Sequence, residues 1–460
     1  MITVEKIGGT SMSQFDNVLK NIIIGKRNND ALYNRIFVVS AYNNVTNWLL
    51  EDKQTKEPGI FSKFVEQTFY RTFIDKLLIN LKEINRSFAN IGLNVMEADV
   101  FISNRIKQAV DYLEKLNDVL TTGYVSKNDI FMAAREILAS VGEAHSAFNS
   151  VNILLNNGIN AVFVDLSGFT DSEFLTIDER IKKALLNVDF TKELPIVTGY
   201  TKGVEGIMRV FDRGYSEVTF SKVAIAVKAD EAIIHKESHL LSADYKIVGL
   251  ENAVLIGATN YDVADQLADI GMQAIHPKTS KPLELAGISL RIKNSFEPDN
   301  EGTIITKNYI SPTPKVEIVT GTNKVIVIEI QETMMIGEIG FDLEIMKIFY
   351  NHKVSYIVKS TAANSISVVI WEKDFSQNLL NDLKTKAEKI VYKECALVCI
   401  IGSNLSKPGI LADAAKVLSD KNINIDIVSF SLKQVNIQLV VSREKYFEAI
   451  NLLNSVYFSN

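Results

Sequence analysis

A lysine followed by two glycines forms the chain's first candidate for chemistry, in the run KIGGTS at residues 6–11. Glycines let backbone N–H groups approach phosphate oxygens, and a lysine adds a full positive charge. The run therefore predicts a phosphate-binding turn of Gly8, Gly9 and Thr10 with Lys6 beside it. It is not the P-loop signature, and an ordinary turn between a strand and a helix would look the same.

Two further motifs place polar groups next to apolar runs. Ser40 and Thr46 bound the segment SAYNNVT, directly after the apolar run RIFVV, where a parallel sheet would expose them. Helix capping by Ser, Asn or Thr is the alternative. Gly142-Glu143 lies inside an otherwise apolar helical stretch. A glycine there costs about 1 kcal/mol relative to alanine, so either a neighbour needs the space or the pair is an exposed glutamate beside a packing glycine.

The segment FDRGYSEVT at 211–219 could recognise both charged ends of an amino acid. Arg213 can grip a carboxylate with two parallel hydrogen bonds, and Glu217 can hold an ammonium. An acidic residue at the start of a helix is also a routine response to the helix dipole. Taken singly, the segment favours that simpler explanation, whereas beside the other three motifs it favours binding of a zwitterion.

Alternating apolar runs and helical stretches must position these residues. Runs typical of strands occur at 35–41, 161–165, 194–200, 231–236 and 290–296. Amphipathic stretches lie between them, as at 132–156 and 217–229, and 48–92 is expected to form helices with a loop. This alternation predicts an α/β domain with a mainly parallel sheet covered on both faces, and ligand sites at the carboxyl ends of the strands.

A repeated strand, helix, strand, strand pattern follows the linker SPTPK at 311–315. Strands are expected at 325–330, 354–358 and 365–371, and again at 396–401, 423–427 and 435–441, with helices at 342–352 and 411–421. Aligning Val354 with Ile423 gives an offset of 69 residues (423 − 354), which also matches Gly340 with Gly409. A fixed offset indicates a repeat, and units this small should pack together.

Composition limits the remaining classes of protein. The 460 residues require two or three domains, and a net charge of −6 gives no basic face for nucleic acid. Cys395 and Cys399 lie four apart in a strand-like run, so buried reduced thiols are expected, whereas a zinc site would need four ligands. No run approaches the roughly 18 apolar residues of a membrane span, so we expect a cytoplasmic protein.

Seven motifs occur in the order in which aspartate kinases carry them: KIGGTS, VVSAYNNVTN, SVGEAHSA, IVTGY, DRGYSEVT, IHPKT and NSFEPDNEGTII. The chain resembles that family over essentially its whole length, and most of all the type associated with ectoine biosynthesis. The resemblance implies an amino-acid-kinase domain over 1–305 and two ferredoxin-like ACT domains over 316–388 and 389–460. It also implies phosphorylation of the L-aspartate side chain by ATP with Mg²⁺, and a homo-oligomer with a possible amino-acid effector.

The resemblance also implies a role for each matching residue. Lys6 would contact the transferring phosphoryl group, and Gly8 and Gly9 would form the phosphate loop. Glu143 would bind the aspartate ammonium, Arg213 would clamp the α-carboxylate, and Ser40 and Thr46 would lie near the substrate. Ser216 with Glu217 would organise the site. No protein ligands for a metal ion are assigned.

The nucleotide segment departs from the family pattern. Within 235–246, only Ala243-Asp244 and the basic residue Lys246 match the family pattern, so Ser242, Asp244 and Lys246 are the residues expected to contact the nucleotide. Gln273 stands where the family usually has a lysine. This departure favours one alternative, a non-catalytic amino-acid-sensing subunit with ligands bound in the ACT repeats. A related kinase that acts on glutamate or carbamate is a separate alternative. For the effector, the second repeat keeps Asp426, but the first has Ile357 at the corresponding place, which predicts a weak response to lysine.

Overall fold

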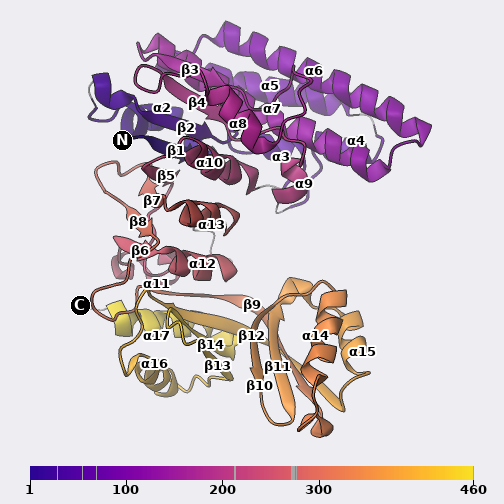
Figure 1. Ribbon diagram of the computed structural model, residues 1–460, viewed down its shortest axis with the longest axis vertical. Helices are drawn as coiled ribbons and strands as arrows, with labels where there is room; N and C mark the ends of the chain where they lie inside the picture. Colours follow the sequence, from indigo (N-terminus) through magenta and orange to yellow (C-terminus); the bar gives the residue numbers. More distant parts are fainter. Residues whose placement is uncertain are drawn as a thin grey trace. The chain divides into compact units, whose positions relative to one another are not determined.

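The computed structural model describes residues 1–27, 29–53, 55–68, 70–211, 214–270, 275 and 277–458. These residues form two compact units (Figure 1). The first consists of Met1–His239 with Lys278–Ile304, and the second of Leu240–Pro277 with Ile305–Asn460. No helix among the described residues combines the length and the apolar character needed to cross a membrane.

A parallel sheet forms the centre of the first unit. Its strands are β1 (Thr3–Ile7), β2 (Arg35–Val39), β3 (Ala161–Val164), β4 (Leu194–Thr198), β5 (Glu231–Lys236) and β7 (Ser289–Asn294). They lie in the order β3-β4-β2-β1-β5-β7, and every neighbouring pair is parallel. All five residues of β2 and of β4 are buried, as expected for strands covered on both faces. The predicted strands and the α/β fold class are confirmed.

Helices cover this sheet on both faces. They are α1 (Gly9–Met12), α2 (Phe15–Asn17), the π-helix η1 (Val18–Ile24), the short η2 (Asn29–Leu32), α3 (Val45–Leu49), α4 (Ile60–Val65), α5 (Arg71–Ser87), η3 (Ala89–Ile91), α6 (Val95–Thr122), α7 (Lys127–Asn156), α8 (Ile177–Leu185), α9 (Ile207–Phe211), α10 (Tyr215–Ala226) and α13 (Pro277–Ala286). The long helices α5, α6 and α7 pack side by side (Figure 1). The strand β8 (Thr303–Thr306) follows β7.

The second unit is built on a six-stranded sheet. The order is β10-β11-β9-β12-β14-β13. Its strands are β9 (Ile318–Gln331), β10 (Tyr356–Thr361), β11 (Ser365–Trp371), β12 (Lys389–Ile401), β13 (Ile427–Phe430) and β14 (Asn436–Ser442). Its other elements are α11 (Tyr245–Val248), η5 (Leu250–Asn252), β6 (Ala258–Asn260), α12 (Tyr261–Asp269), η6 (Thr333–Met335), α14 (Phe341–Asn351), η7 (Glu372–Asp374), α15 (Gln377–Leu383), α16 (Ile410–Ser419), η8 (Arg443–Lys445) and α17 (Tyr446–Phe458).

Two repeats share this sheet. Gly340 and Gly409 precede α14 and α16 with φ of +99° and +104°, a backbone conformation that favours glycine, so the 69-residue offset is confirmed (409 − 340). The strand expected at 423–427 was misplaced, because it begins only at Ile427. The long strand β9 contributes Ile328 to one apolar core and Val319 to the other. A single strand thus serves both cores, and the predicted limits of the two ACT domains stay predictions.

Candidate active site

The ammonium of Lys6 lies near the carboxyl end of β1, against the first turn of α10. Its Nζ is 3.8 Å from Glu217 Oε1, and the two side chains are only 11% and 19% exposed. A Cβ built on Gly8 would lie 3.9 Å from the same nitrogen. Because Gly8 has no side chain, the space beside the ammonium stays open to a ligand, as a phosphate-binding turn requires.

Gly9 packs against the loop that follows β2. A Cβ there would lie 2.7 Å from the carbonyl oxygen of Ala41, which is too close for any side chain. The N–H of Ser40 donates to the carbonyl of Ile7 at 3.1 Å, and the Ser146 hydroxyl donates to the carbonyl of Ser40 at 2.8 Å. The glycine turn, Ser40 and α7 are thus held together at the carboxyl edge of the sheet.

Glu143 is a buried carboxylate with one oxygen left over. Glu143 is 2% exposed, and the Ser216 hydroxyl donates a hydrogen bond to its Oε1 at 2.5 Å. Its Oε2 has no hydrogen-bond partner among the residues that the structure describes. Burial raises the pKa of Glu143 to about 8, although the Ser216 hydrogen bond, the charge of Lys6 and nearby backbone N–H groups oppose that rise. A cationic ligand group would satisfy the oxygen and favour the ionised form.

Glycines make the space around this carboxylate. A Cβ on Gly142 would lie 2.8 Å from the Cβ of Ala41 and 2.9 Å from Val45, so the glycine inside α7 lets the helix approach the loop after β2. A Cβ on Gly199 would lie 2.8 Å from the Cβ of Ser216 and 3.0 Å from Glu143 Oε1. Sequence reasoning singled out Gly142 but gave Gly199 no role, although its motif GY follows β4 directly.

Lys236 is a second lysine at this site that sequence reasoning did not select. It ends β5, next to β1 in the sheet, and is partly buried. Burial lowers its pKa, Glu217 opposes that shift, and the nearby charge of Lys6 adds to it. Its place at the end of the neighbouring strand was the available signal, since parallel strands present their carboxyl ends at one edge.

Other predicted residues have looser or separate positions. Thr10 is exposed in α1, and Thr46 is partly buried in α3, one residue after Val45. Arg213 and Gln273 lie outside the described residues. Of the two described residues, Thr46 lies close to the Glu143 region, because its neighbour Val45 packs against Gly142.

The predicted nucleotide residues belong to the second unit and have local partners there. The Ser242 hydroxyl accepts a hydrogen bond from the N–H of Val254 at 2.9 Å, and it is buried. Asp244 caps α11 by accepting from the N–H of Lys246 at 2.9 Å. Asp244 and the Lys246 side chain are exposed. Ser242 and Asp244 therefore have structural roles that do not depend on a ligand.

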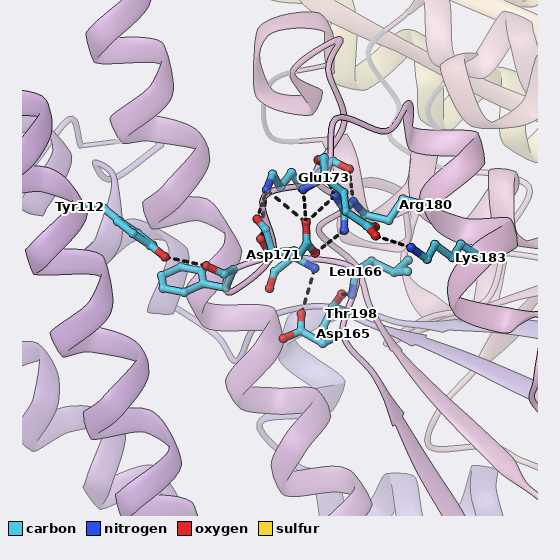
Figure 2. Close-up of polar contacts among 12 residues, drawn as sticks. Tyr112, Asp165, Leu166, Asp171, Glu173, Arg180, Lys183 and Thr198 are labelled. Carbon is cyan, nitrogen blue, oxygen red and sulfur yellow. Dashed lines mark hydrogen bonds and ion pairs between the residues drawn. The ribbon is translucent and has the colours of Figure 1, made fainter.

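The loop after β3 braces the end of β4 (Figure 2). Thr198 accepts a hydrogen bond from the N–H of Leu166 at 3.0 Å and donates to the carbonyl of Tyr200 at 2.9 Å. Arg180 pairs with Asp171 at 2.8 Å and donates to the carbonyl of residue 202 at 2.7 Å. These contacts hold the segment that contains Gly199, next to Glu143.

The arrangement can bind a zwitterion and an anion side by side. Lys6 and the glycine turn offer positive charge and open backbone to an anion, and Glu143 offers an unsatisfied carboxylate oxygen to a cation. Transfer between two ligands held this way would depend on position and charge. Among the residues that the structure describes, no group of three or more His, Cys, Asp or Glu side chains has the arrangement of a metal site.

Comparison with known proteins identifies relatives over the whole chain. The model of the amino acid kinase family matches residues 1–294, and a model of the ACT domain matches residues 398–457. Aspartate kinase Ask_Ect of Stutzerimonas stutzeri is 43% identical over 463 residues, which cover 99% of this chain and 97% of that protein.

Solved structures share the fold. E. coli aspartokinase III in complex with aspartate and ADP matches with a TM-score of 0.71 at 21% identity, and the match covers 100% of both chains. The same enzyme in complex with lysine and aspartate matches with a TM-score of 0.72 at 20% identity, again over 100% of both chains.

Proposed function

This chain belongs to the aspartate kinase family and carries aspartate kinase activity, and we propose that the cluster around Lys6 and Glu143 is its reaction centre. The observation that carries this assignment is the buried Glu143 Oε2, which has no hydrogen-bond partner among the described residues. A buried carboxylate oxygen is costly when unsatisfied, and the ammonium of bound aspartate would satisfy it.

The substrate supplies its own nucleophile. The side-chain carboxyl of aspartate has a pKa near 3.9 in water, so it is an anion at pH 7 and no general base is needed. One of its oxygens attacks the γ-phosphorus of ATP, the bond to the bridging oxygen breaks, and ADP leaves with that electron pair. The product is an acyl phosphate, 4-phospho-L-aspartate.

Lys6 and the glycine turn would neutralise the negative charge of the ATP phosphates. The Lys6 ammonium would meet the γ-phosphoryl group, and backbone N–H groups at Gly8 and Gly9 would meet phosphate oxygens. The open space at Gly8 fits such a group. Mg²⁺ bound to ATP would supply further neutralising charge on the phosphates. Glu217, 3.8 Å from Lys6, would keep that ammonium oriented.

Recognition of aspartate would be divided between its two charged ends. Glu143 would bind the ammonium, while Ser216, hydrogen-bonded to Glu143 at 2.5 Å, would keep the carboxylate in place. Ser40 and Thr46 would lie beside the reacting carboxylate. Arg213 would clamp the α-carboxylate with paired hydrogen bonds. We assign ATP contacts to Ser242, Asp244 and Lys246 on family resemblance alone, since their visible contacts are structural.

Pathway and assembly are further parts of this proposal. The 43% identity to Ask_Ect supports a role in ectoine-type biosynthesis. The ACT region supports an amino-acid effector and a homo-oligomer. Exposed apolar side chains on β13, Val428 at 45% and Phe430 at 39%, give that region a surface suited to a second copy. Light scattering tests the oligomer, and a fully active monomer would contradict it.

Hydroxylamine trapping tests the reaction itself. The full chain with aspartate, ATP and Mg²⁺ should form aspartyl hydroxamate, and glutamate or carbamate in place of aspartate should give far less product. A folded protein that binds amino acids but forms no hydroxamate would instead be a sensing subunit.

Arg213→Ala should weaken aspartate binding by roughly 2–5 kcal/mol with nucleotide binding little changed. Unaltered aspartate kinetics in that variant would remove Arg213 from the site.

A further inference from the structure

A second cavity lies on the opposite face of the same sheet from Lys6. It has a volume of about 580 Å³ and is lined by β1, β5 and β7 together with η1 and the turn after it. Successive side chains of a strand point to opposite faces, so Glu5 and His235 face this cavity whereas their neighbours Lys6 and Lys236 face the candidate active site. The cavity is therefore separate from the reaction centre, with two strands in common.

The carboxylates deep in this cavity already have partners from the chain. Glu5 accepts from Arg35 Nε at 2.6 Å and Nη2 at 3.1 Å, and lies 2.7 Å from His235 Nε2. Burial alone would raise the pKa of Glu5, but Arg35 and His235 together lower it well below its usual range. Glu231 accepts from Arg291 Nε at 2.9 Å. Each carboxylate therefore has an arginine as its ion-pair partner, and both still act on the Lys293 ammonium from a distance.

Three cations of the same cavity have no such partner. In the part of the chain that the structure describes, no carboxylate lies within ion-pair distance of Lys20, Arg27 or Lys293, all of which line the cavity. Arg27 Nη1 donates to the carbonyl of Ile22 at 2.8 Å, and Lys293 Nζ donates to that of Pro298 at 3.4 Å. Each of these bonds leaves donors unused, since an ammonium has three and a guanidinium five.

Like charges crowd one another here. Burial lowers the pKa of Lys293, and the positive charges of Arg27 and Arg291 lower it further, against the opposing effect of Glu5 and Glu231. Burial and the charge of Arg35 lower the pKa of Arg27, and the charge of Glu5 opposes that shift. The chain thus holds partly buried cations together, and among the described residues neither Arg27 nor Lys293 has an ion-pair partner. An anion bound among them would relieve the repulsion and use the free donors.

We propose that this cavity binds a small oxyanion, the carboxylate or phosphate group of a metabolite, between Arg27 and Lys293. Arg27 can present paired N–H donors to two oxygens, and Lys293 supplies a point charge beside them. Lys26 is paired with Asp299 at 2.6 Å and is highly exposed, so it stands at the rim and contributes little. The site goes beyond the kinase reaction, which needs none of these residues.

Calorimetric titration of the full chain with inorganic phosphate and with succinate, at low ionic strength, tests this site. We expect saturable binding of at least one probe, and tighter binding of phosphate or of succinate identifies the source of the oxyanion. Arg27→Gln and Lys293→Gln should each weaken binding about tenfold or more, because each removes a charge-assisted hydrogen bond. Lys26→Gln is the matched control at the rim and should change the affinity by less than about threefold.

Two further measurements separate this site from the reaction centre and from a folding defect. Lys6→Gln, on the other face of β1, should keep the phosphate affinity of the cavity. Without added anion, Lys293→Gln should melt at a higher temperature than the unmodified chain, because it removes a crowded charge, and phosphate should then stabilise it less. Binding that Lys6→Gln abolishes, or that Arg27→Gln and Lys293→Gln leave unaltered, would overturn the proposal, as would no saturable binding of either probe.

Discussion

The charge of Lys6 is held in a position where little reorganisation is needed. Its side chain is 11% exposed, and Glu217 Oε1 stands 3.8 Å away, beyond an ordinary hydrogen bond. The ammonium is thus oriented by the carboxylate without being fully engaged by it. A preorganised charge of this kind acts most strongly where new charge develops during reaction.

We expect Lys6→Ala to lower kcat by about 10²-fold or more, because the lost charge counts most as the phosphoryl group transfers. Lys192→Ala is the matched control, since that lysine is 78% exposed and pairs with Asp189 at the surface. It should leave turnover unchanged. Steady-state kinetics at saturating aspartate and ATP measure both variants, and turnover of Lys6→Ala within a few-fold of the unmodified enzyme would remove Lys6 from the reaction centre.

We expect the proposed role of Glu143 to make aspartate capture dependent on pH. Burial raises its pKa to about 8, so in the free enzyme at pH 7 the carboxyl is largely protonated and cannot hold an ammonium as an anion. The kcat/KM for aspartate should therefore fall as pH drops below about 8. Bound aspartate favours the ionised form, so kcat at saturation should depend less on pH. Glu143→Gln should have a low kcat/KM that no longer falls with pH in this range. If the fall below about pH 8 remains in that variant, another group causes it.

The same pKa shift has a signature in stability. The folded pKa, about 8, is above the usual value of 4.5, so the folded state keeps a proton that the unfolded state has released between those values. The contribution of Glu143 is then fully present below pH 4.5 and is lost as pH rises through about 8. Glu143→Gln carries no such loss. Its melting temperature relative to the unmodified chain should rise with pH across this window.

Sequence patterns identify several of these residues by type but not by environment. KIGGTS and the glycine inside a helix were sufficient to select Lys6 and Glu143. The open Oε2 of Glu143 and the tight fit at Gly199 depend on the approach of α7, β4 and α10. These elements are far apart in the sequence. No local pattern carries that information, so residues such as Gly199 and Lys236 become visible only in the fold.

At the scale of elements, the loop between β3 and α8 acts as a brace for the site. Arg180, with a side chain 6% exposed, joins Asp171 to the backbone of residue 202. The hydrogen bond from Arg180 holds the pKa of Asp171 below its usual range. Figure 2 shows these contacts beside Thr198, whose hydroxyl links the loop to Tyr200. The brace therefore fixes the end of β4 next to Gly199.

We expect Arg180→Ala to destabilise the first unit by about 2–3 kcal/mol, because it leaves hydrogen-bond acceptors and a carboxylate without their donor. The aspartate KM should rise as well, since Gly199 would be less firmly placed. Lys183→Ala is the matched control, because its pair with Glu173 is exposed on both sides. It should cost less than about 0.5 kcal/mol. Denaturant unfolding and aspartate kinetics measure both, and equal effects of the two variants would contradict the brace.

Element prediction succeeded where periodicity was strong. The five apolar runs proved to be strands of one parallel sheet, because buried parallel strands are nearly all apolar. The helix α6 (Val95–Thr122) was not predicted, although its buried residues Ala98, Ile102 and Ala109 recur at helical spacing. The strand expected from Ile423 starts four residues later, after Asn424 and Asp426, which hydrogen-bond to each other.

At the scale of the whole chain, the two ACT repeats form one sheet with two cores. The strand β12 pairs with β9 along its length, and the register shifts between Cys395 and Leu397. Ile390 packs on the first core, and Val398 belongs to the second. The buried thiols Cys395 and Cys399 lie in this shared strand, as their spacing predicted. Events in one repeat can therefore reach the other through continuous backbone.

The predicted effector carboxylate is already engaged by the chain's own lysine. Lys393 Nζ lies 2.7 Å from Asp426 Oδ2, and this hydrogen bond raises the pKa of Lys393. Asn424 donates to the other oxygen, Oδ1, at 2.8 Å. An effector ammonium would have to displace Lys393 before it could bind Asp426. In the first repeat the corresponding residue is Ile357, at an irregularity of the β10–β11 pairing, and an isoleucine accepts no hydrogen bond.

We therefore expect the enzyme to respond weakly to lysine, and Lys393→Met to make it more sensitive. Removing the internal ammonium leaves Asp426 open to that of the effector, so the lysine concentration for half-inhibition should fall about tenfold, equivalent to about 1.4 kcal/mol. Asp426→Asn, alone or combined with Lys393→Met, should abolish the gain because the anionic acceptor is gone. Activity is titrated against lysine and threonine, alone and together, for all variants. Strong inhibition of the unmodified enzyme by sub-millimolar lysine would contradict the expectation, as would a Lys393→Met enzyme with unaltered sensitivity.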